Sequence, residues 1–477
     1  MKASAFIQLS LTLLRQHRSE LSHKTSRFLS SAFTSQRAFH GRSQMCQIPT
    51  VQDELPQLRV PAWDEEFKFK GLETDFPCLS KMPSSGPEPA YNKVLSGYQT
   101  CRIEEPFHMK LNGGVLPGLD IAYETWGELN EDKSNVILIH TGLSSSSHAR
   151  SHEENPDPGW WEKFIGPGCA IDTNKFYVIC SNLLGGCYGS TGPSSINPMT
   201  DEPYGTTFPV ITVDDIVNAQ FKLLDHLGID EVHACVGSSL GGMCSLTAAA
   251  LFPDRVNRVV SISACLYTYP TSIGLRYLQR RAIMMDPNWN RGHYYNKSYP
   301  RMGMKLAREL ATITYRSGPE WHERFGRKVI DPGEEPSLCP YFMIESYIEY
   351  QGESFSTKFD PNTLLYISKA MDLFDMADGF PSLEYSVGRI KCPVMVLGVQ
   401  TDMLIPCWQQ KEVVDTLRKS GNNRVTYYEL DSIFGHDTFL LDLTNVGGAI
   451  KGSLETNLKV AGMVRKSAPK WLKKEGI

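Results

Sequence analysis

The chain has 477 residues, of which 41% are hydrophobic and 21% charged, and its formal net charge is −5. This length and hydrophobic content suffice for one large core or two modest cores, as in a globular protein. The weak negative charge argues against a nucleic-acid-binding surface, and no apolar run reaches the ~18 residues of a membrane-spanning helix. We therefore expect neither nucleic acid nor membrane among its partners.

The first 50 residues differ in composition from the rest of the chain. They hold seven lysines and arginines, nine serines and one acidic residue, Glu20. A basic, serine-rich segment with short amphipathic patches is typical of a mitochondrial transit peptide, so residues 1–50 predict import into the mitochondrial matrix. A disordered basic tail is the alternative. Residues 51–99, rich in proline and acidic residues, predict an irregular lead-in.

Apolar runs of strand length recur from about residue 100 onward, and helical periodicity lies between several of them, as in residues 214–228 and 409–421. Apolar strands that alternate with helices form a mainly parallel sheet with helices on both faces, so the sequence predicts an α/β fold. The expected strands are 121–127, 136–142, 176–182, 232–237, 259–263, 394–399 and 425–430.

The alternation of strands and helices breaks between residues 266 and 389. This interval shows helical patterns instead, at 272–286, 304–316 and 362–376. A helical insertion after the sixth strand is expected to pack as a cap over one end of the sheet, where ligands of such folds bind outside the carboxyl ends of the strands. The predicted domains are a core in two parts, 100–265 and 390–477, and a cap, 266–389.

The twelve cysteines are scattered without C-x-x-C pairs, and many of them, such as Cys180, Cys235 and Cys244, lie in apolar runs. We interpret them as small core residues rather than as a disulfide framework or a zinc site, which favours a reducing compartment. The chain has no ligand cluster at metal spacing, so we expect neither a metal nor a bound organic cofactor.

The sequence GSSLG, residues 237–241, joins an apolar strand run to a helical pattern of small residues. Gly-x-Ser-x-Gly in this context is a nucleophile elbow, a tight turn that only small neighbours permit and that raises the serine at the edge of the sheet. The helix N-terminus at the turn favours developing negative charge. Ser239 is the predicted nucleophile; a strand–helix turn without chemistry is the alternative.

A nucleophilic serine needs a base and a group that orients the base. Asp402 follows the strand run 394–399, and His436 follows the run 425–430. Their order after Ser239 is the order of acid and histidine that accompanies this elbow. We therefore predict Asp402 and His436 as the remaining members of a triad, with a helix N-cap as the alternative role of Asp402.

The negative oxygen of the tetrahedral intermediate needs two hydrogen-bond donors. One is expected to be the backbone amide of Leu240, which follows the nucleophile. The other is expected from the loop 141–143, and Gly142 is the predicted donor. Loss of one such donor typically costs ~3 kcal/mol of transition-state stabilisation.

Further motifs occur in order along the chain. They are LLGGCYGSTGPSS (183–195), GSSLGGM, RRAIMMDPNWNRGHYY (280–295), ESYIEYQG (345–352), FDPNTLLYISKAMDLFD (359–375) and GHDTFLLD. Over roughly residues 100–465 the chain resembles the homoserine O-acetyltransferase family of α/β-hydrolase-fold acyltransferases. The resemblance implies an α/β-hydrolase fold and ping-pong transfer, in which Ser239 takes an acyl group from acyl-CoA and His436 then activates an amino-acid hydroxyl.

The resemblance also implies the residues that bind the acceptor. A cap arginine of the family grips the acceptor's carboxylate, and the matching position is Arg280, although Arg281 stands beside it; a bidentate guanidinium suits a carboxylate. Asp437 is expected to hold the acceptor's ammonium group, with a helix cap as its alternative role. The family tends to form dimers through the cap, which the apolar cap helices would allow.

The loop after the second expected strand departs from the family pattern. Residues 140–148 read HTGLSSSSH where the homoserine enzymes have H-A-L-T-G-D-x-H. The chain thus looks more like the serine O-acyltransferase branch of some bacteria and of fungal mitochondria, which makes O-succinylserine or O-acetylserine for cysteine biosynthesis. A pocket distinguishes serine from homoserine, one methylene longer, by only ~1–3 kcal/mol.

The expected function is therefore an acyl-CoA-dependent L-serine O-acyltransferase. The resemblance to this branch favours succinyl-CoA as co-substrate, and hydroxyls of the serines at 144–147 could supply donors for its carboxylate. Acetyl-CoA is the other donor. A homoserine O-acetyltransferase of methionine biosynthesis is the alternative. A serine esterase or thioesterase would use the same triad with water as acceptor, but a cap arginine favours a transferase.

Overall fold

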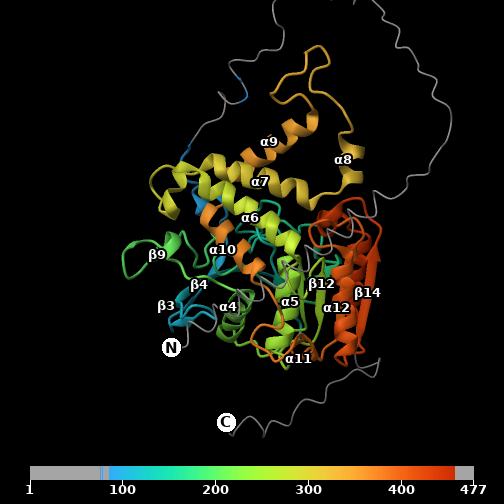
Figure 1. The fold of residues 1–477 in the computed structure, drawn as a ribbon. Coiled ribbons are helices and arrows are strands. Elements are labelled where there is room, and N and C mark those ends of the chain that lie inside the picture. The colour runs from blue at the N-terminus through green and yellow to red at the C-terminus, as the bar shows by residue number, and fades with distance from the viewer. Residues whose placement is uncertain (1–75, 77, 79–84, 457–477) are drawn as a thin grey trace, which may run out of the picture. The chain divides into compact units, whose positions relative to one another are not determined.

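The structure is a computed structural model that describes residues 76, 78 and 85–456. All of the described residues belong to one compact unit, residues 71–477. The expected transit peptide, residues 1–50, and most of the expected lead-in lie outside the described residues. The description below concerns the described part of the chain alone (Figure 1).

Eight strands form the central sheet: β1 (Gln99–Ile103), β4 (Leu119–Trp126), β5 (Val136–His140), β8 (Tyr177–Ser181), β11 (Ala234–Ser238), β12 (Val259–Ile262), β13 (Val394–Val399) and β14 (Val425–Leu430). Their order is β1-β4-β8-β5-β11-β12-β13-β14. The strands from β8 to β14 run parallel, whereas β4 is antiparallel to both of its neighbours. All seven expected strands are present, and the predicted α/β fold is confirmed.

The sheet is buried on both faces, which explains why its central strands are apolar throughout. Alternate residues of β11 enter two different hydrophobic clusters, Cys235 on one face and Ala234 and Val236 on the other. The surrounding helices are α4 (Val213–His226), α5 (Leu240–Leu251), α11 (Leu383–Gly388), α12 (Cys407–Lys419), α13 (Thr438–Leu441) and α14 (Asn445–Glu455). Helices α4, α5 and α12 contribute to the first cluster and α14 to the second.

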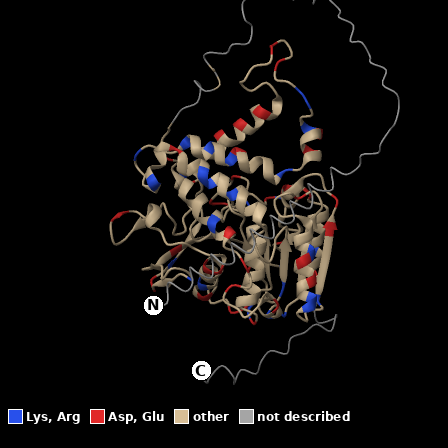
Figure 2. Cartoon of the chain, in the orientation of Figure 1, with Lys and Arg blue, Asp and Glu red and all other residues tan. Residues whose placement is uncertain are grey.

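Short elements connect the parts of the core. They are α3 (Tyr91–Val94) and the paired strands β2 (Phe107–His108) with β3 (Val115–Leu116), β6 (Ile165–Gly166) with β7 (Ile171–Asp172), and β9 (Ile196–Asn197) with β10 (Glu202–Pro203). Lysines and arginines are interspersed with acidic residues along the helices (Figure 2). Among the described residues, no helix combines the length and the apolar character needed to cross a membrane.

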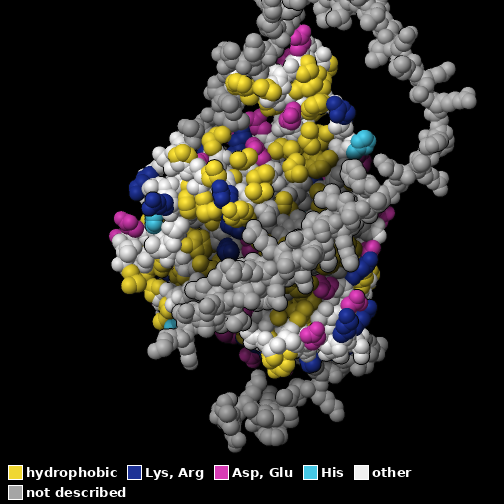
Figure 3. All heavy atoms as spheres, viewed as in Figure 1, with side chains coloured by type: hydrophobic (Ala, Val, Ile, Leu, Met, Phe, Trp, Pro, Cys, Tyr) yellow, Lys and Arg dark blue, Asp and Glu magenta, His cyan; other side chains and the backbone are white. Residues whose placement is uncertain are grey.

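Apart from α11, which packs with the core, most of the chain between β12 and β13 forms a helical cap. Its helices are α6 (Pro270–Met285), α7 (Arg301–Tyr315), α8 (Gly318–Arg324), α9 (Met343–Ser356) and α10 (Pro361–Asp372). The hydroxyl of Ser272 on α6 donates to the carbonyl of Leu404, which follows β13, so the cap lies at the carboxyl end of the sheet. Apolar side chains gather on the outer surface of the cap (Figure 3). The patterns predicted α6, α7 and α10 but not α8 and α9.

The cysteines correct one expectation from the sequence. Nine of those in the described residues are free thiols and seven of these are buried, as core residues should be. Cys78 and Cys339, however, form a disulfide across 261 residues of sequence, with Cα atoms 5.5 Å apart. Neither lies in an apolar run of the core, and their pairing depends on how the lead-in meets the cap.

Substitution of Gly241 by alanine tests the tightest contact of the fold. An added Cβ would lie 2.1 Å from the carbonyl oxygen of His140, so α5 or β5 must shift, and we expect unfolding free energy to fall by about 1–3 kcal/mol. Gly274→Ala in α6 is the control: nothing lies within 4 Å of its added Cβ, and alanine favours a helix by about 1 kcal/mol. Urea unfolding of both variants measures the difference; equal stabilities would contradict the tight contact.

Candidate active site

Ser239 occupies the turn between β11 and α5 in a strained backbone conformation, with φ 56° and ψ −124°. Its amide donates to the carbonyl of Ile262 at the end of β12. A Cβ on Gly237 would lie 2.2 Å from the carbonyl carbon of Gly241, so neither position of the turn tolerates a side chain without movement. The sequence GSSLG therefore folds as the elbow that it predicts, with a largely buried serine at its apex.

Asp402 and His436 lie together in the structure. His436 Nδ1 is 2.7 Å from Asp402 Oδ2, and both side chains are buried. The other oxygen of Asp402 accepts from the amides of Leu404 and Ile405, each at 2.9 Å. Helix α12 has Pro406 as its N-cap, so Asp402 does not cap it. The carboxylate is thereby fixed on both oxygens and orients the imidazole.

The second ring nitrogen of His436 is the one that a catalytic base would use. His436 Nε2 is buried and has no hydrogen-bond partner among the described residues, Ser239 included. Ser239 and Asp402 follow strands β11 and β13, which are two places apart in the sheet, or about 10 Å. An imidazole held by Asp402 can span part of that gap toward the serine. Burial lowers the pKa of His436, but the Asp402 carboxylate more than offsets this, so the pKa lies above its usual 6.5.

The two expected oxyanion donors come from neighbouring segments. Leu240 is the first residue of α5, so its amide has no acceptor within the helix. Gly142 follows β5, and the close approach of Gly241 to the carbonyls of His140 and Thr141 brings the start of α5 against this loop. Both residues thus follow the carboxyl ends of the neighbouring parallel strands β5 and β11, and their role as oxyanion donors stays a prediction.

The buried carboxylate of Glu124 anchors the loop 140–148, whose sequence departs from the family pattern. Glu124 accepts from Ser147 Oγ and lies 2.7 Å from both His148 Nδ1 and His152 Nε2. These three groups bring potential metal ligands within 4.8 Å of one another, yet the hydrogen bonds already pair them. His148 Nε2 also contacts the carbonyl of Asp157. We assign the cluster a structural role, which leaves His148 unavailable as a base.

Helix α6 presents two arginines to the interior. Arg280 lies 2.5 Å and Arg276 2.6 Å from the two oxygens of Asp372 on α10, because residues four apart share a helix face. Arg281 is exposed and stacks near Tyr277. Of the neighbouring pair named from the sequence, Arg280 is thus the buried one.

The sequence analysis did not single out Arg276. Arg276 and Arg280 share one carboxylate, so this buried cluster carries an excess positive charge. Arg276 Nη2 is buried without a partner among the described residues, and its charge acts to lower the pKa of His436, which places Arg276 in electrostatic range of the base. The i, i+4 spacing to Arg280 was the signal that could have found it.

Asp437 stands next to His436 in the short helical turn Gly435–Asp437 and makes no capping hydrogen bond to α13. Its Oδ2 lies 3.4 Å from Arg316 Nη2. Burial raises the pKa of Asp437 to about 6, against the lowering effects of Arg316, His436 and Arg308. The residue is therefore a largely buried acid that Arg316 contacts and that Arg308 and His436 influence at longer range.

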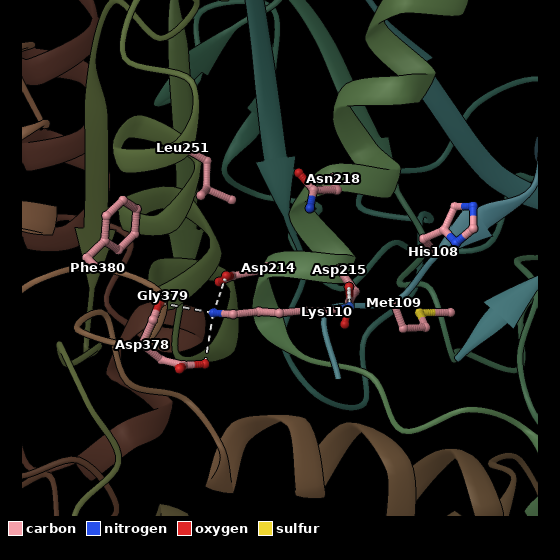
Figure 4. Close-up of a pocket in the computed structure, with 10 residues that line it drawn as sticks. All are labelled: His108, Met109, Lys110, Asp214, Asp215, Asn218, Leu251, Asp378, Gly379 and Phe380. Atoms are coloured by element: carbon pink, nitrogen blue, oxygen red, sulfur yellow. Dashed lines mark hydrogen bonds and ion pairs between the residues drawn. The ribbon is translucent and has the colours of Figure 1, made fainter. Parts of the chain in front are cut away.

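A separate cavity of about 350 Å³ lies away from these residues, between α4, the far end of α5 and the segment that returns from the cap (Figure 4). It borders Leu251, about 18 Å along α5 from Ser239. Lys110 is its one lysine, and Asp214 and Asp378 already pair with it. The cavity adds nothing to the site at Ser239.

Comparison with known proteins decides the family. A model of the alpha/beta hydrolase fold matches residues 135–443. This chain belongs to that family. Serine O-succinyltransferases of Schizosaccharomyces pombe and Emericella nidulans are 49% and 45% identical to it, over 88% and 89% of this chain and 96% and 93% of theirs. A homoserine O-acetyltransferase structure from Bacillus anthracis superposes with a TM-score of 0.70 at 30% identity, over 76% of this chain and 99% of the other. The resemblance found in the sequence is confirmed.

The pH dependence of the acylation of Ser239 tests the role of His436. Only the neutral imidazole can accept a proton, so we expect the burst of nitrophenolate from p-nitrophenyl acetate to rise with pH through the pKa of His436, above the usual 6.5. Asp402→Asn removes the group that raises this pKa. The pH range over which the burst rate rises, the acidic limb of the profile, should then move to lower pH. The burst rate itself should fall by up to ~10⁴. An unmoved limb would reject the Asp402–His436 pair as the base.

Proposed function

We propose that this protein transfers a succinyl group from succinyl-CoA to the hydroxyl of L-serine, through an acyl-Ser239 intermediate, for cysteine biosynthesis in the mitochondrial matrix. The buried arginine pair on α6, with its excess positive charge near His436, carries the proposal, because both substrates bear carboxylates. The near full-length similarity to proteins named serine O-succinyltransferase supports it. The basic composition of residues 1–50 supports the compartment.

In the first half-reaction, Ser239 Oγ attacks the thioester carbonyl and its proton passes to His436 Nε2. The amides of Leu240 and Gly142 stabilise the negative oxygen. The carbon–sulfur bond then breaks, His436 returns the proton to the thiolate, and CoA leaves. Ser239 holds the succinyl group as an ester, and the imidazole is neutral again.

In the second half-reaction, the hydroxyl of L-serine gives its proton to His436 and attacks the ester carbon. The same amides stabilise the second tetrahedral intermediate. The bond to Ser239 breaks, His436 protonates Ser239 Oγ, and O-succinylserine leaves. We assign the acceptor's carboxylate to Arg280 and its ammonium group to Asp437, since a bidentate cation and a carboxylate would fix both ends of the amino acid.

Arg276 is our candidate for the distal carboxylate of the donor. Its Nη2 is buried without a partner among the described residues and can donate a charged hydrogen bond, whereas a serine hydroxyl donates a neutral one. Ser147 Oγ bonds to Glu124, and Ser146 Oγ accepts from the amide of His148. We therefore propose that the distal carboxylate of succinyl-CoA contacts α6 rather than the serines of the loop 144–147.

Homoserine O-acetyltransferase activity is the second candidate, favoured by the structural likeness to the Bacillus anthracis protein.

We also propose a homodimer through the cap. Exposed apolar side chains on α6, α7 and α9 support this (Figure 3), and they include Leu278, Met285, Leu306 and Tyr350.

Four rates test the proposed activity. Serine and homoserine are offered with succinyl-CoA and with acetyl-CoA to protein lacking residues 1–50, and CoA release is followed. We expect serine with succinyl-CoA to give the highest kcat/KM, and Ser239→Ala to abolish every rate without loss of fold by circular dichroism. A highest rate with homoserine and acetyl-CoA would favour the second candidate, and release that no amino acid accelerates would favour a thioesterase.

Substitution of Arg276 tests donor choice. Arg276→Leu removes a charged hydrogen bond worth about 1.5–3 kcal/mol, so acylation by succinyl-CoA should fall roughly 10–100-fold relative to acylation by acetyl-CoA. Arg281→Leu on the exposed face of α6 is the matched control and should preserve the donor ratio. Equal losses with both donors would assign Arg276 a structural role instead.

A further inference from the structure

The cap touches the core at the loop that carries His436. Ser317, just after α7, donates its hydroxyl to the carbonyl of Ile433. Gly435 packs so closely that an added Cβ would lie 3.0 Å from the carbonyl carbon of Arg316 and from the amide nitrogen of Ser317. Because these are backbone contacts, the end of α7 and the loop 433–437 form one unit.

Arg316 extends from this contact toward Asp437. It is the C-cap of α7, and its side chain is largely buried. Its guanidinium pairs with Glu320 through Nη1 and lies 3.4 Å from Asp437 Oδ2 through Nη2. The structure gives the other oxygen of Asp437 no ion pair within the described residues, so Arg316 occupies one side of the carboxylate.

The charges around Asp437 come from every element packed against it. Arg316 and Arg308 from α7, and His436 from its own loop, favour the carboxylate, whereas Glu320 from α8 and burial oppose it. Arg308 is held in place by stacking over Tyr315 and Phe355, 5.1 and 4.5 Å from their ring centroids. Arg316 is the cation in direct contact, and it comes from the cap rather than the core.

We propose that Arg316 is a positioning residue for the acceptor: it holds the carboxylate of Asp437 as the anion that receives the ammonium group of the amino acid. This inference rests on the proposed function. A neutral carboxyl group would lose most of its attraction for an ammonium ion. The acceptor site therefore exists only while the end of α7 is seated on the loop that carries His436, which links cap position to acceptor binding.

Paired substitutions of opposite sign test the proposal. Arg316→Gln should raise the pKa of Asp437 above about 6, so the rise of kcat/KM for serine with pH moves to higher pH. KM at neutral pH should increase about twofold if that pKa rises by one unit and about tenfold if it rises by two, in proportion to the loss of the ionised carboxylate. Glu320→Gln removes an opposing charge and should move the limb to lower pH. Arg316→Lys should restore most of the serine affinity.

Two controls separate this effect from damage to the fold. Arg324→Gln removes an exposed cation from α8 and should change neither KM nor the limb. Acyl-enzyme formation, measured as the burst of CoA release without acceptor, reports an intact site in each variant. In an Asp437→Asn background, Arg316→Gln should change the serine KM by less than about twofold, because coupled residues are not additive.

The outcomes distinguish a failure of the proposed function from a failure of the proposed role of Arg316. Wild-type protein that forms no acyl-enzyme, or transfers nothing to serine, overturns the proposed function before any variant is made. Wild-type transfer together with an unmoved limb in Arg316→Gln and Glu320→Gln overturns the role of Arg316 alone. Limbs that move in the same direction in both variants also overturn it, since the two substitutions change the charge beside Asp437 in opposite directions. The Asp437→Asn background separates this effect from one on His436.

Discussion

The backbone contact between Gly241 and His140 is the constraint on which the rest of the site depends. It presses the start of α5 against the end of β5, so the turn at Ser239 must adopt its strained conformation. The same contact brings the amide of Leu240 beside the loop at Gly142. Buried parallel strands on both sides hold the arrangement, because β11 pairs with β5 and β12 along its length. A strained turn persists only where the surrounding structure fixes it in this way.

Core and cap supply different chemistry to the site. The core contributes Ser239, Asp402 and His436, and these groups would serve any acyl transfer to any acceptor. The cap contributes the cations: Arg276 and Arg280 from α6, and Arg316 from the end of α7. Buried charges are costly unless they are paired, yet two arginines share Asp372. An incoming carboxylate would relieve this imbalance, which supports the proposed selection of charged substrates by the cap.

The sequence predicted most of the core but only part of the cap, and the reason is burial. Strands such as β5 and β13 are buried throughout, so their apolar runs stand out, whereas the edge strand β1 has exposed residues between its buried ones and was missed. Helix α9 buries few residues and shows a weak apolar face. The disulfide of Cys78 and the ion pairs of Asp372 and Asp437 join distant segments, and such pairings have no local pattern in the sequence.

The loop 140–148, whose sequence differs from that of the homoserine enzymes, is fixed at both ends by contacts with the core. At its far end, Ser147 and His148 are fixed to Glu124, and His148 also contacts the carbonyl of Asp157. At its near end, the carbonyls of His140 and Thr141 are fixed against Gly241. Only residues 142–146 lie between these two anchors. A sequence change confined to this span reshapes the wall beside the reacting carbonyl and leaves the elbow and the Asp402–His436 pair in place, so substrate choice can change while the chemistry is retained.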